Sequence, residues 1–176
     1  QRLKQLTLDL VEASKISSGN ITLEMSDINV KELLNQAIGE YEEKLSEKKL
    51  ALVTSYPEEE VIIRADSRRM WRVTENLLVN ICKYSMEGTR VYVDVAKVSA
   101  DERDMIGITF KNISAQPLNI PAEELTERFI RGDVARSTEG SGLGLSIAQN
   151  LTVAQGGEFK IHLDGDLFKV VLRFPR

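Results

Sequence analysis

The chain has 176 residues, 42% of them hydrophobic, which is enough for one medium-sized domain with a core and a short appendage. Its net charge is −4 and it has no basic stripe with interleaved aromatic residues, which argues against a nucleic-acid-binding protein. One cysteine and one histidine exclude an internal disulfide and a zinc cluster. We interpret Cys82, on the apolar side of its predicted helix, as a small buried hydrophobe.

The first predicted element is a helix that ends near Ser17-Ser18-Gly19-Asn20, where Gly or Asn can take the left-handed cap. It carries an apolar stripe at the 3-4-3 spacing of a coiled coil or bundle: Leu3, Leu6, Leu10 and Ala13. Because so short a helix is marginal alone, the stripe needs a partner. That partner is a second copy of the chain or, alternatively, the body of the same domain. Since the chain opens mid-helix without an initiator Met, we expect it to be part of a longer protein.

Strands and helices then alternate. A short strand over Ile21–Met25 precedes a helix over Val30–Lys49, for which Asp27 is the predicted cap. Leu50–Tyr56 and Val61–Arg64 are expected to form a pair of strands. No run of about 18 apolar residues occurs anywhere, so the sequence predicts no membrane span.

The next helix is capped by Asp66 or Ser67, runs to Tyr84, and has two distinct sides. One side is a predicted core stripe: Trp71, Thr74, Leu77, Leu78, Ile81 and Cys82. On the other side Asn76, Asn80 and Lys83 fall within about 60° of one another on an ideal helix. Two amide oxygens and one cation suit a magnesium–triphosphate, although a solvated polar face is the alternative interpretation.

Two strands, Arg90–Val98 and Met105–Asn112, lead into a mostly irregular segment over 114–141 that is typical of a lid or of disorder. A short helix over Glu123–Phe129 is expected within it. Four apolar residues should pin its first half to the body: Leu118, Ile120, Leu125 and Phe129. A helix over Leu143–Gln155 and a closing hairpin over Asp164-Gly165-Asp166 follow.

A glycine run, Gly140-Ser141-Gly142-Leu143-Gly144-Leu145, opens that last helix. Such a turn presents backbone N–H groups at the positive end of the helix dipole, which suits phosphate. It lacks the lysine of a P-loop and the spacing of a dinucleotide fingerprint. The alternative is a helix start at which small residues permit close packing.

Three motifs in order resemble those of bacterial two-component sensor histidine kinases, in the catalytic ATP-binding domain of the GHKL type. They are the asparagine box over Glu75–Ser85, the phenylalanine box over Leu125–Asp133 and the glycine run. The resemblance covers roughly 28–176, while residues 1–20 resemble the end of the dimerisation domain and its connector. We therefore expect two parts, 1–20 and the ATP-binding domain over 21–176.

The resemblance implies a fold and a site. The fold is an α/β two-layer sandwich, a mixed sheet with three helices on one face, preceded by the N-terminal helix. Asn80 and Asn76 would hold Mg²⁺, Lys83 would meet a phosphate, Phe129 would anchor the lid and Arg131 would reach the γ-phosphate. The implied ATP-binding residues are Asn76, Asn80, Lys83, Tyr84, Asn112, Phe129, Arg131, Gly140, Gly142, Leu143, Gly144 and Leu145.

Two positions depart from family patterns. Asn112 stands where the family has an Asp that accepts from the adenine amino group, and no glycine follows it until Gly132. The loss of charge assistance would cost about 1 kcal/mol of binding. In related ATPases that hydrolyse ATP, a water-activating Glu occupies the position of Asn76, and an amide cannot accept that proton.

The resemblance implies a protein-histidine kinase that uses Mg²⁺ and ATP, with no catalytic residue assigned in this chain. His162, predicted on a strand and half exposed, is not the acceptor, which belongs to a dimerisation helix absent here. Implied partners are the protein's own dimerisation domain in a homodimer and a response regulator, with no nucleic acid and no membrane contact by this part. The implied location is a cytoplasmic domain of a membrane-anchored sensor. The alternatives are a degenerate scaffold domain that regulates a partner, and a hydrolytic ATPase.

Overall fold

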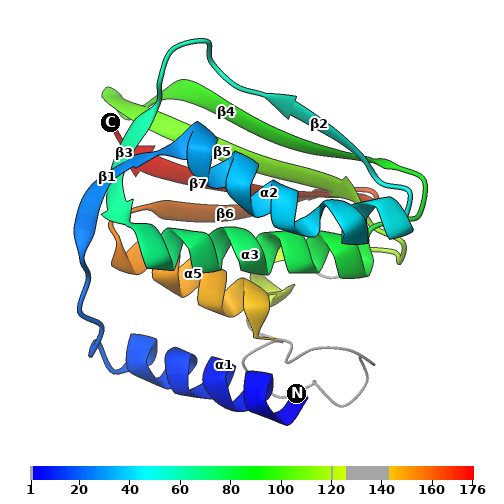
Figure 1. Cartoon of the computed structure of the whole chain (residues 1–176), viewed down its shortest axis with the longest axis horizontal. Helices are drawn as coiled ribbons and strands as arrows, with labels where there is room; N and C mark the ends of the chain where they lie inside the picture. Colours follow the sequence, from blue (N-terminus) through cyan, green and yellow to red (C-terminus); the bar gives the residue numbers. More distant parts are fainter. Residues whose placement is uncertain (1, 120, 126–142) are drawn as a thin grey trace.

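The computed structural model describes residues 2–119, 121–125 and 143–176. In chain order the elements are α1 (Arg2–Ser17), β1 (Met25–Asn29), α2 (Val30–Glu47), β2 (Ala51–Ser55), β3 (Ile62–Asp66), α3 (Ser67–Tyr84), β4 (Arg90–Ala100), β5 (Arg103–Ile113), α5 (Gly144–Ala154), β6 (Glu158–Asp164) and β7 (Leu167–Pro175). Helices α2, α3 and α5 cover one face of a sheet, and α1 lies apart from that layer (Figure 1). This arrangement confirms the predicted two-layer sandwich.

The larger sheet has the strand order β2-β4-β5-β7-β6, with β2 parallel to β4 and the other neighbours antiparallel. It is therefore the mixed sheet that the sequence led us to expect. Strand β7, the last element of the chain, lies between β5 and β6. A second, two-stranded sheet pairs β1 with β3 and leads directly into α3.

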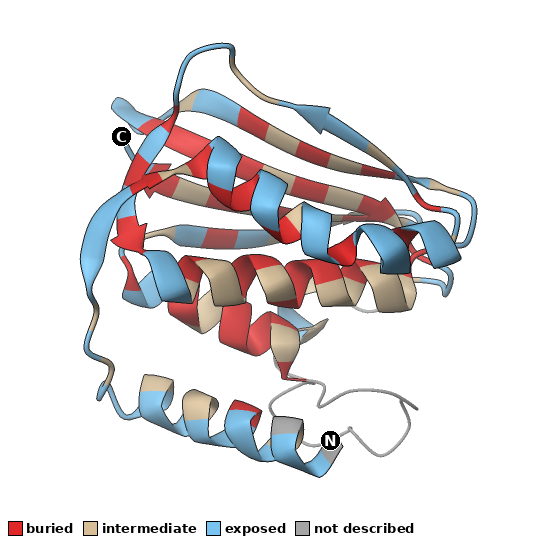
Figure 2. Ribbon diagram, viewed as in Figure 1, coloured by how far each residue is buried: buried red, intermediate tan, exposed pale blue. Residues whose placement is uncertain are grey.

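The core lies between the sheet and the helices, where alternate strand residues point inward (Figure 2). On β7 these are the buried side chains of Phe168, Val170, Leu172 and Phe174. Full burial of one such side chain contributes roughly 1.5–3 kcal/mol. Packing is closest at Gly157, where an added Cβ would lie 2.7 Å from Cε1 of Phe174, so the position needs glycine.

Three predictions around the first strands are wrong. Residues 21–24 belong to no strand, because β1 begins at Met25 to pair with β3. Asp27 lies in β1 opposite Arg64, and the cap of α2 is Asn29, whose Oδ1 accepts from the N–H of Glu32 at 3.2 Å. Strands β2 and β3 do not pair with each other, because each finds its partner in a different sheet.

Helix α3 begins at its predicted cap, Asp66, and ends at Tyr84 as expected. Its core side differs in detail, since Met70 and Val73 are fully buried whereas Trp71 and Cys82 are only half buried. The prediction placed the apolar side slightly too far round the helix. Helix α2 starts at the predicted residue and ends two residues early, at Glu47.

Helix α1 ends as predicted, with Gly19 in the left-handed region at a φ of 69°. Leu6 is half buried and Ala13 packs against the core, as in the second interpretation of the stripe, with the body as partner. Leu3 and Leu10 stay exposed, so pairing with a second copy remains a prediction.

The C-terminal part follows its predictions closely. Helix α5 spans Gly144–Ala154, one residue shorter at each end than predicted, and β6 and β7 form the expected hairpin. His162 lies on β6 as predicted but is exposed, where half exposure was expected. Leu118 and Leu125 pack against the core as expected. Most of the predicted lid, with Ile120 and Phe129, lies outside the described residues.

Candidate nucleotide site

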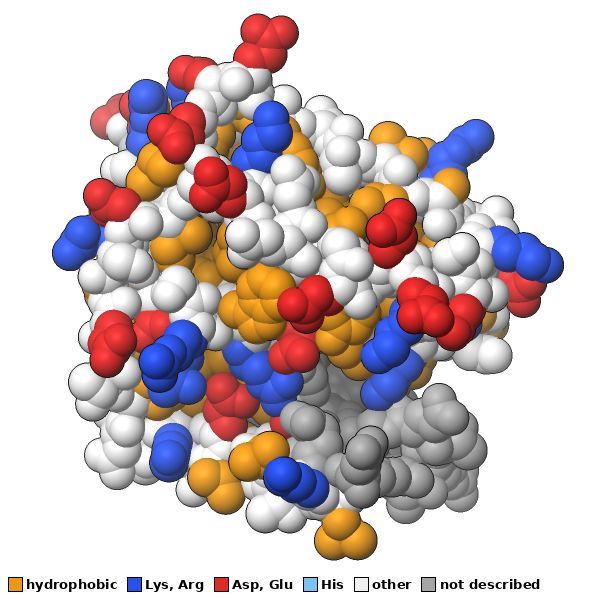
Figure 3. Space-filling view, in the orientation of Figure 1, with side chains coloured by type: hydrophobic (Ala, Val, Ile, Leu, Met, Phe, Trp, Pro, Cys, Tyr) orange, Lys and Arg blue, Asp and Glu red, His pale blue; other side chains and the backbone are white. Residues whose placement is uncertain are grey.

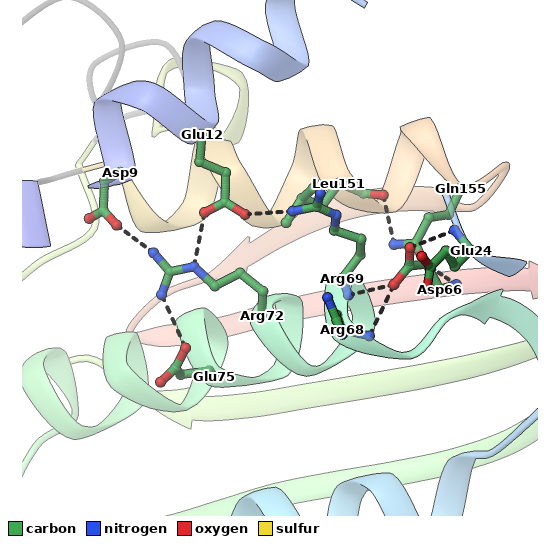
Figure 4. A network of polar contacts seen from close by, with 10 residues as sticks. All are labelled: Asp9, Glu12, Glu24, Asp66, Arg68, Arg69, Arg72, Glu75, Leu151 and Gln155. Carbon is green, nitrogen blue, oxygen red and sulfur yellow. Dashed lines mark hydrogen bonds and ion pairs between the residues drawn. The ribbon is translucent and has the colours of Figure 1, made fainter. Parts of the chain in front are cut away.

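The candidate site is built along α3, and its first turn is fixed by a buried junction (Figure 4). The Asp66 carboxylate accepts hydrogen bonds from the N–H groups of Arg68, Arg69 and Glu24 at 3.0, 3.2 and 2.9 Å. The Asp66 N–H donates to Oε1 of Gln155, at the end of α5, at 2.8 Å. The junction therefore sets α3 against α5 before either helix reaches the site.

The hydrogen bonds of this junction stabilise the charged form of Asp66. Burial would raise the pKa of its carboxyl group, but the three backbone N–H groups outweigh burial and hold the pKa below its usual range. Gln155 is satisfied as well, because its Nε2 donates to the carbonyl of Leu151 at 2.9 Å. Each of these buried polar groups has a partner within the chain.

The last turn of α3 is held from α2. The Lys48 ammonium group donates to the carbonyl oxygens of Lys83 and Ser85, at 2.8 and 3.1 Å. A cation at a helix C-terminus satisfies the final carbonyls and complements the helix dipole. The asparagine box therefore ends in a fixed position.

Asn76, in the middle of α3, faces the start of α5. Its side chain is 8% exposed, and its Nδ2 has no hydrogen-bond partner among the described residues. A Cβ added to Gly144 would lie 3.6 Å from Oδ1 of Asn76, in contact with the amide. Gly144 thus lets the start of α5 approach the amide closely, and a buried polar group without a partner normally marks a ligand or a water.

Among the described residues no side chain caps the first turn of α5, and the N-cap position is the apolar residue Leu143. Side-chain caps normally satisfy some of the first N–H groups of a helix, and anions do so at phosphate-binding helices. Asn76 and the start of α5 were predicted as two separate parts of the site. The contact between Asn76 and Gly144 shows that they are neighbours in the fold.

Asn80, Lys83 and Tyr84 are half buried on the following turns of α3, and Leu145 is buried in the first turn of α5. Phe129, Arg131, Gly140 and Gly142 lie outside the described residues. The described part of the predicted site therefore comprises α3, the first residues of α5 and Asn112.

Asn112 lies deeper than the sequence indicated. It is 2% exposed on β5, and its Nδ2 donates to Oγ of Ser85 at 2.9 Å. Ser85 is the C-cap of α3 and is itself buried. This role of Ser85 was not predicted, and its place as the last residue of the asparagine box was the only signal for it in the sequence.

Residues 65–176 match the family described as histidine kinase-, DNA gyrase B- and HSP90-like ATPases. The chain belongs to this family. The match contains α3, α5 and every predicted site residue, so the candidate site lies within the ATPase domain.

Sensor kinases are among the relatives of this ATPase domain. The probable sensor protein PcoS of Escherichia coli is 31% identical over 98% of the chain, and the sensor protein VanS of Enterococcus faecium is 32% identical over 89%. The chain spans only 36% and 40% of the lengths of these two relatives.

Solved structures share the fold. The histidine kinase AdeS of Acinetobacter baumannii superposes with a TM-score of 0.76 at 19% identity, covering 98% of the chain and 78% of AdeS. The catalytic domain of the histidine kinase ThkA gives 0.72 at 23% identity, covering 87% and 96%. The fold is therefore that of histidine kinase catalytic domains.

The described side chains limit how this ATPase domain could hold a metal ion. They contain no group of three or more His, Cys, Asp or Glu residues that could hold a metal ion. Mg²⁺ accepts neutral oxygen ligands, keeps several waters and takes further oxygens from substrate phosphates. The side-chain oxygens of Asn76 and Asn80, one turn apart on α3, are neutral ligands of this kind. The unpartnered Nδ2 of Asn76 is a donor and suits an acceptor such as a phosphate or water oxygen. No helix in the part of the chain that is described is both long and apolar enough to cross a bilayer.

Proposed function

We propose that the chain binds Mg-ATP as the catalytic domain of a sensor histidine kinase. The γ-phosphoryl group would pass to a histidine on a dimerisation domain, and from there to an aspartate of a response regulator. The unpartnered amide of Asn76 beside Gly144 supports this proposal most directly. The Asn76 amide offers an oxygen to a cation and an unpartnered Nδ2 to an acceptor, and it faces the start of α5. Together they fit a ligand that carries both a cation and phosphates.

Each residue then has a role at a stated atom. The side-chain oxygens of Asn80 and Asn76 would hold Mg²⁺, the Lys83 ammonium group would pair with a phosphate, and the first N–H groups of α5 would cradle the others. When bound, the metal ion neutralises the charge of the phosphate oxygens. Lys48 keeps the carbonyls of Lys83 and Ser85 engaged, and so holds the last turn in place.

The same residues favour transfer over hydrolysis. An amide at position 76 cannot take a proton from water, so the site lacks a general base there. Transfer to a positioned acceptor needs orientation and charge stabilisation, which amides, a lysine and helix N–H groups supply.

The proposal extends to the organisation of the protein. Residues 1–20 would be the end of the dimerisation domain, through which two copies pair, and residues 21–176 would be the ATP-binding domain. We further propose a cytoplasmic location in a membrane-anchored bacterial sensor. The competing function is a scaffold domain that does not bind ATP productively, which the burial of Asn112 beside Ser85 would favour.

Calorimetric titration with ATP, with and without Mg²⁺, separates the two functions. Asn80→Ala should abolish Mg-dependent binding and leave the melting temperature within a few degrees, because Asn80 is only half buried. Asn35→Ala, at an exposed position on α2, is the matched control and should bind normally. Binding by Asn80→Ala equal to that of the parent chain would contradict the proposed site. If this variant unfolds, Lys83→Gln tests the same site, because it removes the proposed ion pair with a phosphate and should weaken the binding of Mg-ATP.

A further inference from the structure

Helix α1 contacts the body through charged side chains as well as through Ala13 and Ile16, which pack against the core. Asp9 is 5% exposed, whereas Leu3 is 81%, Leu10 54% and Leu8 53% exposed. Apolar side chains are visible along this helix in the lower part of Figure 3. The helix therefore turns acidic residues toward the body and leaves much of its apolar surface uncovered, unlike an ordinary surface helix.

The contact is a network of ion pairs with two arginines of α3 (Figure 4). The Arg72 guanidinium binds Asp9 through Nη2, Oε2 of Glu12 through Nε at 3.0 Å, and Oε2 of Glu75 through Nη1 at 3.1 Å. Arg69 Nη1 lies 3.5 Å from Oε1 of Glu12. We call this group of five side chains, with Asp9 and Glu12 supplied by α1, the α1–α3 ion-pair network.

The network sits beside the candidate site. Arg72 lies one helical turn before Asn76, and residues spaced by four on a helix are surface neighbours. Within the network, three carboxylates outnumber two guanidinium groups, so its net charge is −1 while α1 is docked. Without Asp9 and Glu12 the same part of α3 keeps Arg69, Arg72 and Glu75, and its net charge is +1.

We propose that α1 is an acidic latch whose docking on α3 opposes the binding of a polyphosphate at the neighbouring site. The latch rests on the proposed function, because it regulates the same site. When α1 is docked, Asp9 and Glu12 add two negative charges near the position of the phosphates. They also form ion pairs with Arg69 and Arg72, which would otherwise attract the phosphates. Binding of Mg-ATP therefore loosens α1, and release of α1 strengthens binding, since coupling between two sites is reciprocal.

Two features of the contact between α1 and the body would allow α1 to detach: a cleft beside the network and a connector that is only partly held. A cleft of about 640 Å³ lies beside the network, lined by the apolar side chains of Leu8, Val11 and Ile21 together with Glu12, Arg69 and Arg72 of the network. Apolar packing between α1 and the body is therefore incomplete. Residues 18–24, which connect α1 to β1, belong to no strand and contain Gly19 in the left-handed region. Part of this connector can thus move without breaking a sheet.

The first test neutralises the acidic side of α1. The double variant Asp9→Asn/Glu12→Gln should bind Mg-ATP about three- to tenfold more tightly by calorimetry, and the gain should shrink as salt rises. Glu42→Gln/Glu43→Gln, exposed on α2, changes the net charge equally and should bind like the parent chain. Equal affinity in the double variant and the parent would overturn the latch, as would an equal gain in the α2 control.

The second test does not depend on affinity. Without nucleotide, the double variant should show faster hydrogen exchange over α1 than the parent chain, and Mg-ATP should speed exchange over α1 in the parent. Unchanged exchange over α1 in the double variant would overturn the latch. If no variant binds Mg-ATP, the proposed function fails, and the coupling to ATP fails with it. Faster exchange in the double variant would then still support ion-pair docking of α1.

Discussion

Helix α3 carries two buried polar side chains whose surroundings are opposite. Asp66, at its start, is 5% exposed and accepts three backbone hydrogen bonds, while Asn76, nearly three turns later, is 8% exposed and its Nδ2 has no partner among the described residues. A satisfied buried group stabilises the fold, whereas an unsatisfied one costs about 1–3 kcal/mol. The comparison indicates that the start of α3 serves folding and its middle serves a ligand.

Removal of Asp66 should have the largest effect on stability. We expect Asp66→Ala to lower the free energy of unfolding by about 3 kcal/mol, because an N-cap and a charged acceptor are lost together. Urea unfolding measures this loss. Asp27→Ala, which removes an exposed ion pair with Arg64, should cost less than about 0.5 kcal/mol. A loss below about 1 kcal/mol at Asp66 would show that the junction is not a main support of α3.

Acid should remove the contribution of Asp66. Because its pKa is lowered in the folded state, its charged form stabilises the fold fully above the pKa of the unfolded chain, about 3.9. That contribution is lost as the pH falls from there through the folded pKa. The difference in unfolding free energy between the parent chain and Asp66→Asn should therefore be constant near neutrality and shrink at low pH. A difference that grows on acidification would mean that the pKa is raised.

The pair Ser85 and Asn112 should give an intermediate effect. Ser85→Ala leaves the buried Nδ2 of Asn112 without its partner, so we expect a loss of about 1–2 kcal/mol in urea unfolding. Ser55→Ala, exposed on β2, is the control and should be nearly neutral. If Ser85→Ala also changes the affinity for ATP, the amide of Asn112 is oriented by Ser85 for the base as well as for the fold.

Asn76 should have the smallest effect on stability. Asn76→Leu keeps a similar volume and removes the unpaired amide, so the free energy of unfolding should stay within about 1 kcal/mol of the parent chain. Binding of Mg-ATP should fall by at least about tenfold in the same protein, as expected for the loss of one charge-assisted contact. Asn35→Leu should leave binding unchanged. A loss of stability above about 2 kcal/mol would make Asn76 a structural residue and remove the contrast with Asp66.

Periodicity and cap chemistry were enough to predict most helices, the Asp66 cap and the closing hairpin, because these depend on residues close in sequence. Strand partners were not predictable in this way. The pattern of Leu50–Tyr56 indicates a strand but does not encode that it pairs with β4 and not with β3. Asp27 and Asn29 have equivalent cap chemistry, and only the pairing of β1 with β3 decides between them.

In the candidate site, too, features that depend on residues close in sequence were predictable and contacts between distant residues were not. The asparagine spacing and the glycine run were visible in the sequence, and the structure brings Asn76 to Gly144. The bond between Asn112 and Ser85 joins residues 27 positions apart, and the ion pairs of Arg72 with α1 join residues 60 or more apart. Neither contact leaves a local pattern, so only the fold could reveal them.

The position of β7 has a consequence for synthesis. Because β7 follows both β5 and β6 in the chain and pairs with each of them, this sheet cannot be completed until residues 167–175 have left the ribosome. Until then β5, which carries Asn112, presents one unpaired edge to other chains. A nascent chain stalled before β7 would therefore expose an edge strand that is prone to aggregation.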